Sequence, residues 1–430
     1  MLNLRQCEKM ALEKSPFVEE ALLTLDRSRA RHAQASHARF VPGLNLRNVW
    51  GPIPKRAGAY RDGVLISPDT SFAFSNLSFF TDIEFNVVQP LFTFGKLTGM
   101  SRAAYNGVLA DEANLEKTEN DVQLKTRELY WGLLMGKELL LIAEKAQEDV
   151  KGAENKVRAL LDEDSEEVNQ TDLFKLELFK YEIKKRRRDA ILKFETAQTG
   201  LRILLDLEDD VDFDLESDVI DAIDFDRDSL DVYYAIALNR RPELAQLQAG
   251  IQARKALMTV ANSDYYPQFF VAGQIKYNYA RNVFDPNNPF VYNPTNFFRP
   301  GIVVGFNWNL NFTQVRDRSR LAYVEFRQMQ QKESLLLDGV KLEVQTAYLQ
   351  LEQAEINMRD SEVALLAGLN WLRSETMKWD IGAGEVKDLI DAYKANATME
   401  TEHLQNVFKF NVAVAKLGKA IGKDLYINLN

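Results

Sequence analysis

Residues that build catalytic and metal sites are scarce in this sequence. Its 430 residues include one cysteine, Cys7, and three histidines, His32, His37 and His403. A single cysteine excludes an intrachain disulfide, which suits a reducing compartment or an envelope protein without bridges. No two histidines have the i, i+4 spacing that places two metal ligands on one helix face. Glycine-rich phosphate loops and serine nucleophile elbows are also missing, so we predict no enzyme, no cofactor and no metal site.

Long hydrophobic runs and positive charge are scarce as well. No run approaches about 18 consecutive apolar residues, so no transmembrane helix is expected. The net charge of −10 argues against a nucleic-acid partner, because phosphate binding needs a basic face. Hydrophobic residues at 46% and charged residues at 27% are nevertheless typical of a folded protein. Met1 is followed directly by a helical pattern, so we expect either a cytoplasmic protein or one whose signal peptide is absent here.

The chain resembles itself once along its length. The sequence "SRAAY" at 101–105 matches "SRLAY" at 319–323, and a second match lies upstream of each. We therefore predict two structural repeats, residues 1–215 and 216–430, each with a helix, two strands, a very long helix and a returning helix. An acidic stretch at 206–228 is expected to connect them, with a short strand or two.

Four segments alternate between apolar and polar residues, as half-buried strands do. They are residues 43–50, 79–88, 269–279 and 302–312. In the last segment Phe306 and Trp308 would point to one face, and Asn307 and Asn309 to the other. The segments between the paired strands, 51–63 and 284–296, are rich in Pro, Gly and Asn, which predicts exposed loops.

Alternation of this kind also occurs in soluble β-sandwiches, but two observations favour a membrane barrel. Small closed barrels need about eight strands, and this chain offers four. Aromatic residues cluster at the strand ends, as in the interfacial girdles of outer-membrane barrels. Because open sheet edges are not tolerated in lipid, several chains would have to pool their strands, with the apolar face toward lipid.

Two helices of unusual length are predicted, at about residues 96–160 and 313–379. Each would be about 100 Å long, which exceeds the depth of a globular core. The second carries an unbroken heptad seam. Its members are Val340, Val344, Ala347, Leu351, Ala354, Met358, Ser361, Leu365, Gly368 and Leu372. A second seam, made of Leu342, Leu349, Ile356 and Val363, lies on a neighbouring face, so the helix is expected to have two neighbours, as in a tube of helices.

Three motifs, taken in order, resemble the TolC-like outer-membrane efflux family. They are "QPLFTFGK" after the second strand, "YYPQ" before the third, and "WDIGAGEVKDLIDAYKAN" where the last long helix turns back. The resemblance implies a mainly α fold in which a trimeric α-barrel of long coiled-coil helices joins a 12-stranded β-barrel. It also implies an outer-membrane channel-tunnel that serves as the passive exit duct of a tripartite efflux or type I secretion system.

Partners and location follow from the same resemblance. It implies a homotrimer in the outer membrane of a Gram-negative bacterium, in contact with outer-membrane lipid and with a periplasmic helical tunnel. A periplasmic adaptor (membrane fusion) protein and an inner-membrane pump would dock on it. The exported substrate does not follow from the resemblance. The alternative is a structural coiled-coil scaffold protein with a soluble β end, which would need no detergent for extraction.

The resemblance also implies a functional site where the helices turn back. Asp388 and Asp391 would line the pore constriction, although acidic residues also stabilise the first turn of a helix by themselves. A periplasmic tip network would include Thr171, Asp172, Trp379 and Gly382. Trp379 stands where well-known members carry tyrosine, and Gly384 stands where they carry a bridging arginine. These two departures put the family's way of latching the closed state in doubt.

Two charged runs have a simpler interpretation beside a functional one. The basic run at 184–188 is expected to be a solvated helix face, or else a contact for an adaptor. The acidic run at 162–167 is expected to be a solvated turn, or else part of an electronegative entrance.

Overall fold

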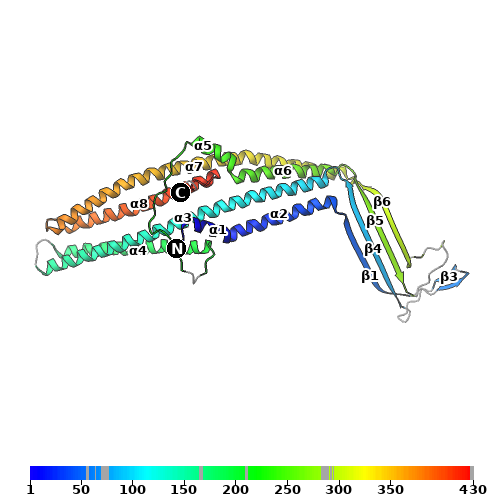
Figure 1. The fold of residues 1–430 in the computed structure, drawn as a ribbon, viewed down its shortest axis with the longest axis horizontal. Helices are drawn as coiled ribbons and strands as arrows, with labels where there is room; N and C mark the ends of the chain where they lie inside the picture. Colours follow the sequence, from blue (N-terminus) through cyan, green and yellow to red (C-terminus); the bar gives the residue numbers. More distant parts are fainter. Residues whose placement is uncertain are drawn as a thin grey trace. The chain divides into compact units, whose positions relative to one another are not determined.

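The computed structural model describes residues 1–54, 58–62, 64–68, 77–163, 168–208, 212–281, 290, 293 and 295–426. The described chain is mainly helical, with one four-stranded sheet (Figure 1). Its elements divide into two compact units. Unit 1 comprises Met1–Leu25, Ala110–Leu247 and Lys332–Asn430, and unit 2 comprises Asp26–Leu109 and Gln248–Gln331.

The elements follow one another in a similar order in the two halves of the chain. The first half contains α1 (Leu4–Lys14), α2 (Pro16–Phe40), β1 (Gly43–Pro54), β2 (Gly58–Arg61), β3 (Val64–Pro68), β4 (Leu77–Phe92), α3 (Lys96–Asp162) and α4 (Gln170–Leu204). The second contains α5 (Leu230–Arg240), α6 (Pro242–Ser263), β5 (Gln268–Ala280), β6 (Phe297–Asn307), α7 (Phe312–Asp380) and α8 (Val386–Ile421). Both very long helices are present close to their predicted bounds. The division into repeats at residue 215 stays a prediction.

The sheet of unit 2 has the order β1-β4-β5-β6, and every neighbouring pair is antiparallel. The strands from the two halves of the chain meet at the central β4–β5 pair. One finding differs from the sequence prediction, and one part of that prediction stays untested. A short hairpin, β2–β3, occupies part of the expected first loop. Most of the expected second loop, at 284–296, lies outside the described residues.

The fourth strand is displaced from its predicted position. Alternation predicted a strand at 302–312, but β6 spans Phe297–Asn307. The reason is the partner strand: β5 begins at Gln268, whose Cα faces that of Asn307, and beyond this pair β6 has nothing to bond to. The chain then turns, with the side chain of Asn309 accepting from the backbone N–H of Asn311 (3.0 Å), and α7 begins at Phe312.

The apolar seam predicted in α7 forms one of the hydrophobic cores of unit 1. Val340, Val344 and Leu351 are buried and pack with α5 and α8. The second predicted seam, Leu342, Leu349, Ile356 and Val363, is exposed along its whole length. The seam prediction is confirmed for the first face, and the second face is left uncovered by the described part of the chain.

The acidic connector lacks the predicted strands in its described part. Within 206–208 and 212–228 there is one isolated bridge, between Leu2 and Leu215. Instead of strand pairing, the connector is held by a buried amide on α8. The Asn411 side chain accepts from the N–H of Ile223 (3.0 Å) and donates to the carbonyl of Asp221 (2.8 Å). None of the described helices is long and apolar enough to cross a membrane.

Candidate functional site

The four-stranded sheet has one face without any charged side chain among its described strands. Successive side chains of a strand point to opposite faces, and the register then places each residue on one of the two. The apolar face carries Leu44, Leu46, Trp50, Phe79, Ile83, Phe85, Val87, Phe269, Val271, Ile275, Tyr277, Tyr279, Phe298, Ile302, Val304 and Phe306. Much of this face is open in the chain: Ile302 is 83% exposed and Val304 73%. Monomeric soluble proteins rarely leave so large an apolar patch uncovered.

Aromatic residues gather toward both ends of the apolar face. At one end Trp50 stacks on Phe79 (ring centroids 6.2 Å apart), and the rings of Tyr277 and Tyr279 lie parallel. At the other end Phe269 lies beside Phe306 (6.0 Å). From Phe269 to Tyr279 a strand rises about 33 Å, which a tilt of about 40° reduces to about 25 Å. That is the height of the apolar band of outer-membrane barrels.

The turn from the sheet into α3 carries further aromatic residues and a strained backbone. Phe94 has a φ of 47°, in the left-handed region that bulky residues rarely adopt. Its ring stacks on Tyr266 (4.7 Å) and meets Phe92 edge-on (4.6 Å). These ring contacts offset the strain and fix the point where the strand becomes a helix.

The predicted orientation of the fourth strand is confirmed within β6 and wrong beyond it. Phe306 lies on the apolar face and Asn307 on the polar one, as expected. Trp308 and Asn309 follow the end of the strand. The indole N–H of Trp308 donates to the carbonyl of Tyr265 (3.1 Å), and its ring meets Phe312 edge-on.

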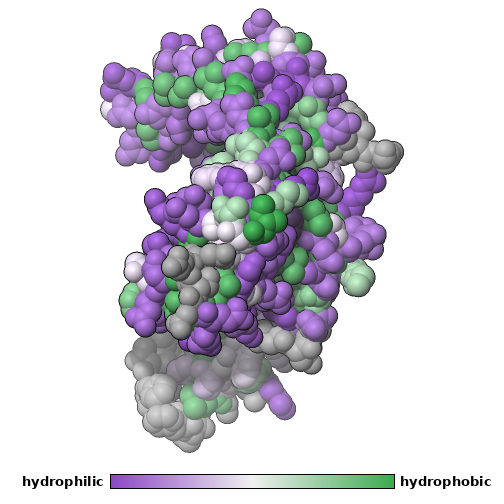
Figure 2. Space-filling model, turned by 90° about the vertical axis from the view of Figure 1, so that its left-hand side faces the viewer, coloured by the Kyte–Doolittle hydropathy of each residue, from purple (hydrophilic) through white to green (hydrophobic). Residues whose placement is uncertain are grey.

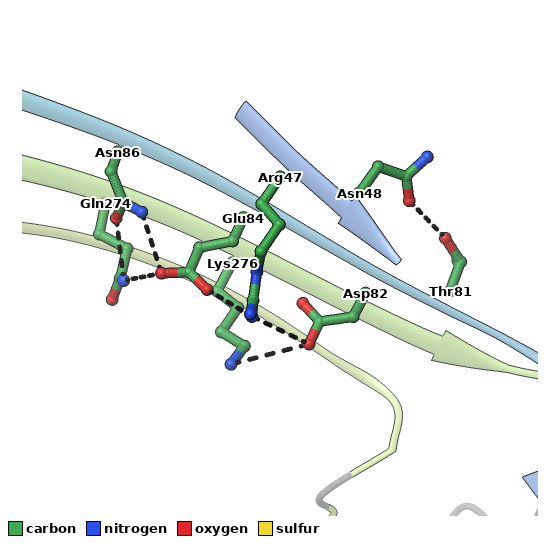
Figure 3. Close-up of polar contacts among 8 residues, drawn as sticks. All are labelled: Arg47, Asn48, Thr81, Asp82, Glu84, Asn86, Gln274 and Lys276. Carbon is green, nitrogen blue, oxygen red and sulfur yellow. Dashed lines mark hydrogen bonds and ion pairs between the residues drawn. The ribbon is translucent and has the colours of Figure 1, made fainter. Parts of the chain in front are cut away.

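The opposite face of the sheet carries a cluster of charged and amide side chains (Figure 3). Arg47 donates to Glu84 (3.0 Å) and lies 3.8 Å from Asp82, which also faces Lys276 at 3.9 Å. Three neighbouring strands supply these four side chains. The cluster therefore makes this face of the sheet hydrophilic, while the other side is apolar.

The Asn86 and Gln274 amides complete the cluster on the polar face. Both donate to Glu84, over 2.9 and 3.0 Å, so this carboxylate accepts from three side chains. The pair Asn48 and Thr81, also drawn in Figure 3, is joined by a hydrogen bond of 3.2 Å and lies on the opposite face, where the register places Thr81 beside Trp50 and Tyr279.

At the other candidate site, α7 ends in a tight backbone turn that its glycines make possible. Gly382 has a φ of 75°, and its N–H donates to the carbonyl of Trp379 (3.2 Å). The N–H of Ala383 donates back to Lys378 (2.9 Å), which completes a Schellman cap. A Cβ at Gly384 would lie 2.8 Å from the backbone nitrogen of Trp379. The turn is therefore closed too tightly at residue 384 for the arginine that the family resemblance places there.

Trp379 is buried inside unit 1. It belongs to a core cluster with Val157, Phe179 and Leu389, from α3, α4 and α8. The Lys156 ammonium lies 5.1 Å from the centre of the indole ring and 3.2 Å from the carboxylate of Asp380. Trp379 therefore ties the end of α7 to the other hairpin, by packing and a cation–π contact.

Asp388 and Asp391 project away from that core. Both are exposed, whereas Leu389, Ile390 and Ala392 between and beside them are buried. Asp388 lies in the first turn of α8, where its negative charge interacts favourably with the helix dipole. The nearby Lys378 is bonded to Glu375 (2.7 Å); this contact, and to a lesser extent Asp388, raises the pKa of Lys378.

Asp172 and Thr171 lie where α4 begins, and their polar contacts are local. Asp172 accepts from the backbone N–H of Asn169 (3.1 Å) and from Lys175 (2.9 Å), and Thr171 donates its N–H to the Asn169 side chain. Asn169 and Asp172 form a capping box, which stabilises a helix start. A role in a tip network stays a prediction.

An exposed stripe on α4 was not recognised in the sequence. Phe174, Leu178, Tyr181 and Leu192 are each more than 60% exposed, and their spacings follow a heptad. Lys185 and Arg188, from the predicted basic run, continue the same stripe and are exposed. The signal in the sequence is a heptad spacing of four and three, which becomes complete only when Lys185 and Arg188 are counted together with the apolar residues. Of the acidic run, residues 164–167 lie outside the described part of the chain.

Figure 2 views the protein from the side where the α3–α4 and α7–α8 hairpins turn back. Hydrophilic residues predominate on this face, with separate hydrophobic residues among them. Such a surface suits contact with water or with a polar partner.

Comparisons with known proteins give a match in structure and none in sequence. No family model and no curated relative matches the chain. Among solved structures, the outer-membrane channel MtrE of Neisseria gonorrhoeae superimposes with a TM-score of 0.79 at 15% identity, over 98% of this chain and 89% of that one. The CmeC outer-membrane channel of Campylobacter jejuni gives 0.78 at 15%, over 98% and 85%. The outer-membrane protein VceC of Vibrio cholerae gives 0.75 at 12%, over 98% and 96%. The chain has the fold of these proteins, which confirms the predicted fold class of long helices joined to a four-stranded sheet.

Proposed function

We propose that this chain, which has the fold of the outer-membrane factor channels, is one subunit of an outer-membrane channel-tunnel that serves as a passive exit duct. The observation that carries the proposal is the uncovered apolar face of the sheet, which has no charged residue among the described strands. A lipid environment would cover that face, and its aromatic ends would lie at the two membrane interfaces.

Closure of the sheet requires more than one copy. The strands β1 and β6 form the two edges of the described sheet, and open edges are not tolerated in lipid. Three copies would pool 12 strands into one closed barrel, the number that the family resemblance implies. The polar face, with its charged cluster, would then line the water-filled interior.

The helices offer two different surfaces for contact between copies. One is the stripe on α4, and the other is the exposed seam of α7. Lys185 and Arg188 on α4 are nearly as many residues from the end of the α3–α4 hairpin as Asp360 and Glu362 on α7 are from the end of the α7–α8 hairpin. All four side chains are exposed. A contact between two different surfaces generates a ring when the rotation closes, as a tube of helices requires.

The first prediction is the mass of the assembly. Extraction should require detergent, and mass measurement in detergent should give about three times the 49.2 kDa of one chain. A monodisperse monomer that stays in solution without detergent would contradict the channel and favour the coiled-coil scaffold.

The second prediction concerns the constriction. Three copies of Asp388 and Asp391 around one axis would attract cations, as acidic rings do in other pores. The double change Asp388→Asn and Asp391→Asn should lower cation selectivity and block by multivalent cations in a planar bilayer, with the assembly intact. A Glu/Glu double variant keeps the charge and should behave like the unchanged protein. Unchanged selectivity in the Asn/Asn variant would assign both residues to helix stabilisation alone.

Docking partners are proposed at the hairpin ends. A periplasmic adaptor protein and an inner-membrane pump would meet the hydrophilic surface seen in Figure 2. The support is the family resemblance together with that surface.

A further inference from the structure

Four of the five charged residues on the strands of the sheet stand in one row that crosses all four strands. Arg47 on β1 faces Glu84 on β4, Glu84 faces Lys276 on β5, and Lys276 faces Arg299 on β6. The row therefore holds three cations and one carboxylate. The remaining charged side chain of the polar face, Asp82, is two residues from Glu84 on the same strand.

The two carboxylates are recessed beneath the cations. The side chains of Asp82 and Glu84 are 15% and 19% exposed, whereas that of Arg47 is 56% exposed and that of Lys276 33%. Glu84 is also covered by the Asn86 and Gln274 amides that donate to it. Water and solutes on this side consequently meet positive charge first, and the five charges sum to +1 per chain.

The surroundings of the row leave it accessible. Gly301 faces Gln274 beside the row, and a Cβ built at Gly301 meets no atom within 4 Å. No charged residue of the described strands lies on the opposite face of the sheet. The whole charge of the sheet is therefore presented on the face that carries the row.

We propose that this row is a selectivity band that favours anionic solutes, or anionic groups on larger solutes, in the sheet end of the channel. The proposal rests on the proposed function, because three copies are needed to wrap the row around a pore. A closed barrel would then carry nine cations and three carboxylates in the band, with three copies of Asp82 beside it. Charged rings of one sign select ions of the other sign in pores. The band would have the sign opposite to that of the hairpin-end carboxylates.

The test measures reversal potentials in a planar bilayer under a potassium chloride gradient. The background is the protein with Asp388→Asn and Asp391→Asn, so that the hairpin end does not set the selectivity. In that background, Lys276→Gln with Arg299→Gln should lower the chloride-to-potassium permeability ratio about twentyfold, because the same change in potential acts on the two ions with opposite sign. This estimate assumes that the two substitutions in three copies remove six charges, each about 10 Å from the permeating ion in water and screened over one Debye length. Glu84→Gln, which removes a carboxylate from the same row, should raise the ratio.

Inorganic tripolyphosphate supplies a second readout. Added on the side of the sheet, it should reduce the current through the background protein and reduce it less in the Lys276→Gln, Arg299→Gln variant. A pore whose permeability ratio and tripolyphosphate block are the same in all three proteins would overturn the band while leaving the channel in place. If the background protein forms no pore at all, the proposed function fails and the band with it. If the Lys276→Gln, Arg299→Gln variant does not assemble, the Glu84→Gln variant tests the band. A raised chloride-to-potassium permeability ratio supports it, and an unchanged or lowered ratio contradicts it.

Discussion

Replacing Arg127 by methionine is expected to lower the free energy of unfolding by about 3–5 kcal/mol, the cost of removing one partner from a buried ion pair. Arg127 is buried on α3. It bonds to Glu8 on α1 and, through two nitrogens, to Asp424 beyond α8 (2.8 and 2.7 Å). The Tyr426 ring covers its guanidinium at 5.3 Å. Methionine keeps the packing volume but leaves two partly buried carboxylates without their cation.

The pH dependence of this loss follows from the two carboxyl groups. Burial raises the pKa of Glu8, and Arg127 opposes that rise. Burial also opposes ionisation of Asp424, but the hydrogen bonds and charge of Arg127 outweigh it and lower that pKa. The stability that Asp424 contributes is therefore lost as the pH falls below its ordinary value of about 4. Without Arg127, burial outweighs the remaining contacts, which are Arg5 for Glu8 and the backbone N–H of Tyr426 for Asp424. Both pKa values are then raised, and the folded variant takes up protons more readily than its unfolded chain.

The deficit of the variant should consequently be largest at pH 7 and shrink as the pH falls toward about 4. Denaturant unfolding of the detergent-solubilised protein, followed by circular dichroism at several pH values, measures it. Arg186→Met is the matched control, because Arg186 is an exposed arginine on α4 that donates a 3.3 Å hydrogen bond to the hydroxyl of Thr398. It should change stability by less than about 0.5 kcal/mol. A deficit for Arg127→Met that stays the same at every pH would contradict the assignment of the loss to these carboxylates.

Patterns with a short period were predictable from the sequence. The heptad of α7 gave both its buried seam and its exposed one, because spacings of three and four fix a helix face without further information. Alternation gave all four strands of the sheet. It failed at the end of β6, since Trp308, Leu310 and Phe312 continue the alternation after the strand has lost its partner at Gln268. A strand ends where its neighbour ends, and that neighbour is 40 residues away in the sequence.

Features that depend on register or on long-range contact were not predictable. The charged row needs the pairing of Arg47, Glu84, Lys276 and Arg299, which no single strand reveals. The partners of Arg127 lie more than 100 residues away on either side. At the hairpin end, the family pattern marked Gly384 as a missing arginine. Only the backbone shows that no side chain fits there without moving the turn.

The position of each apolar residue along its strand is another property that the structure adds. Sequence alternation singled out Phe306 as lipid-facing, and β6 confirms its face. Phe306 nevertheless lies at the aromatic end of that face, against Phe269, where an arginine would cost only about 0–1 kcal/mol. Ile302 lies midway between Phe298 and Phe306 on the same face and is 83% exposed in the chain. It is therefore the residue expected at the bilayer midplane.

Ile302→Arg is accordingly expected to cost about 2–4 kcal/mol for each copy of the chain, because a charged side chain would face hydrocarbon at the midplane. Three copies multiply the penalty within one barrel, so the variant should largely fail to appear as trimers in outer-membrane fractions. Val303→Arg is the matched control. Val303 is the next residue after Ile302, but it lies on the polar face, paired with Ala272, so an arginine there would project into water. Heat-resistant trimers on gels, quantified for both variants and for Phe306→Arg, give the ranking. We expect Ile302→Arg to be the most impaired, Phe306→Arg intermediate and Val303→Arg nearly normal. If Ile302→Arg and Val303→Arg assemble equally well, the two faces of β6 do not meet different solvents, and the sheet is not the wall of a membrane barrel.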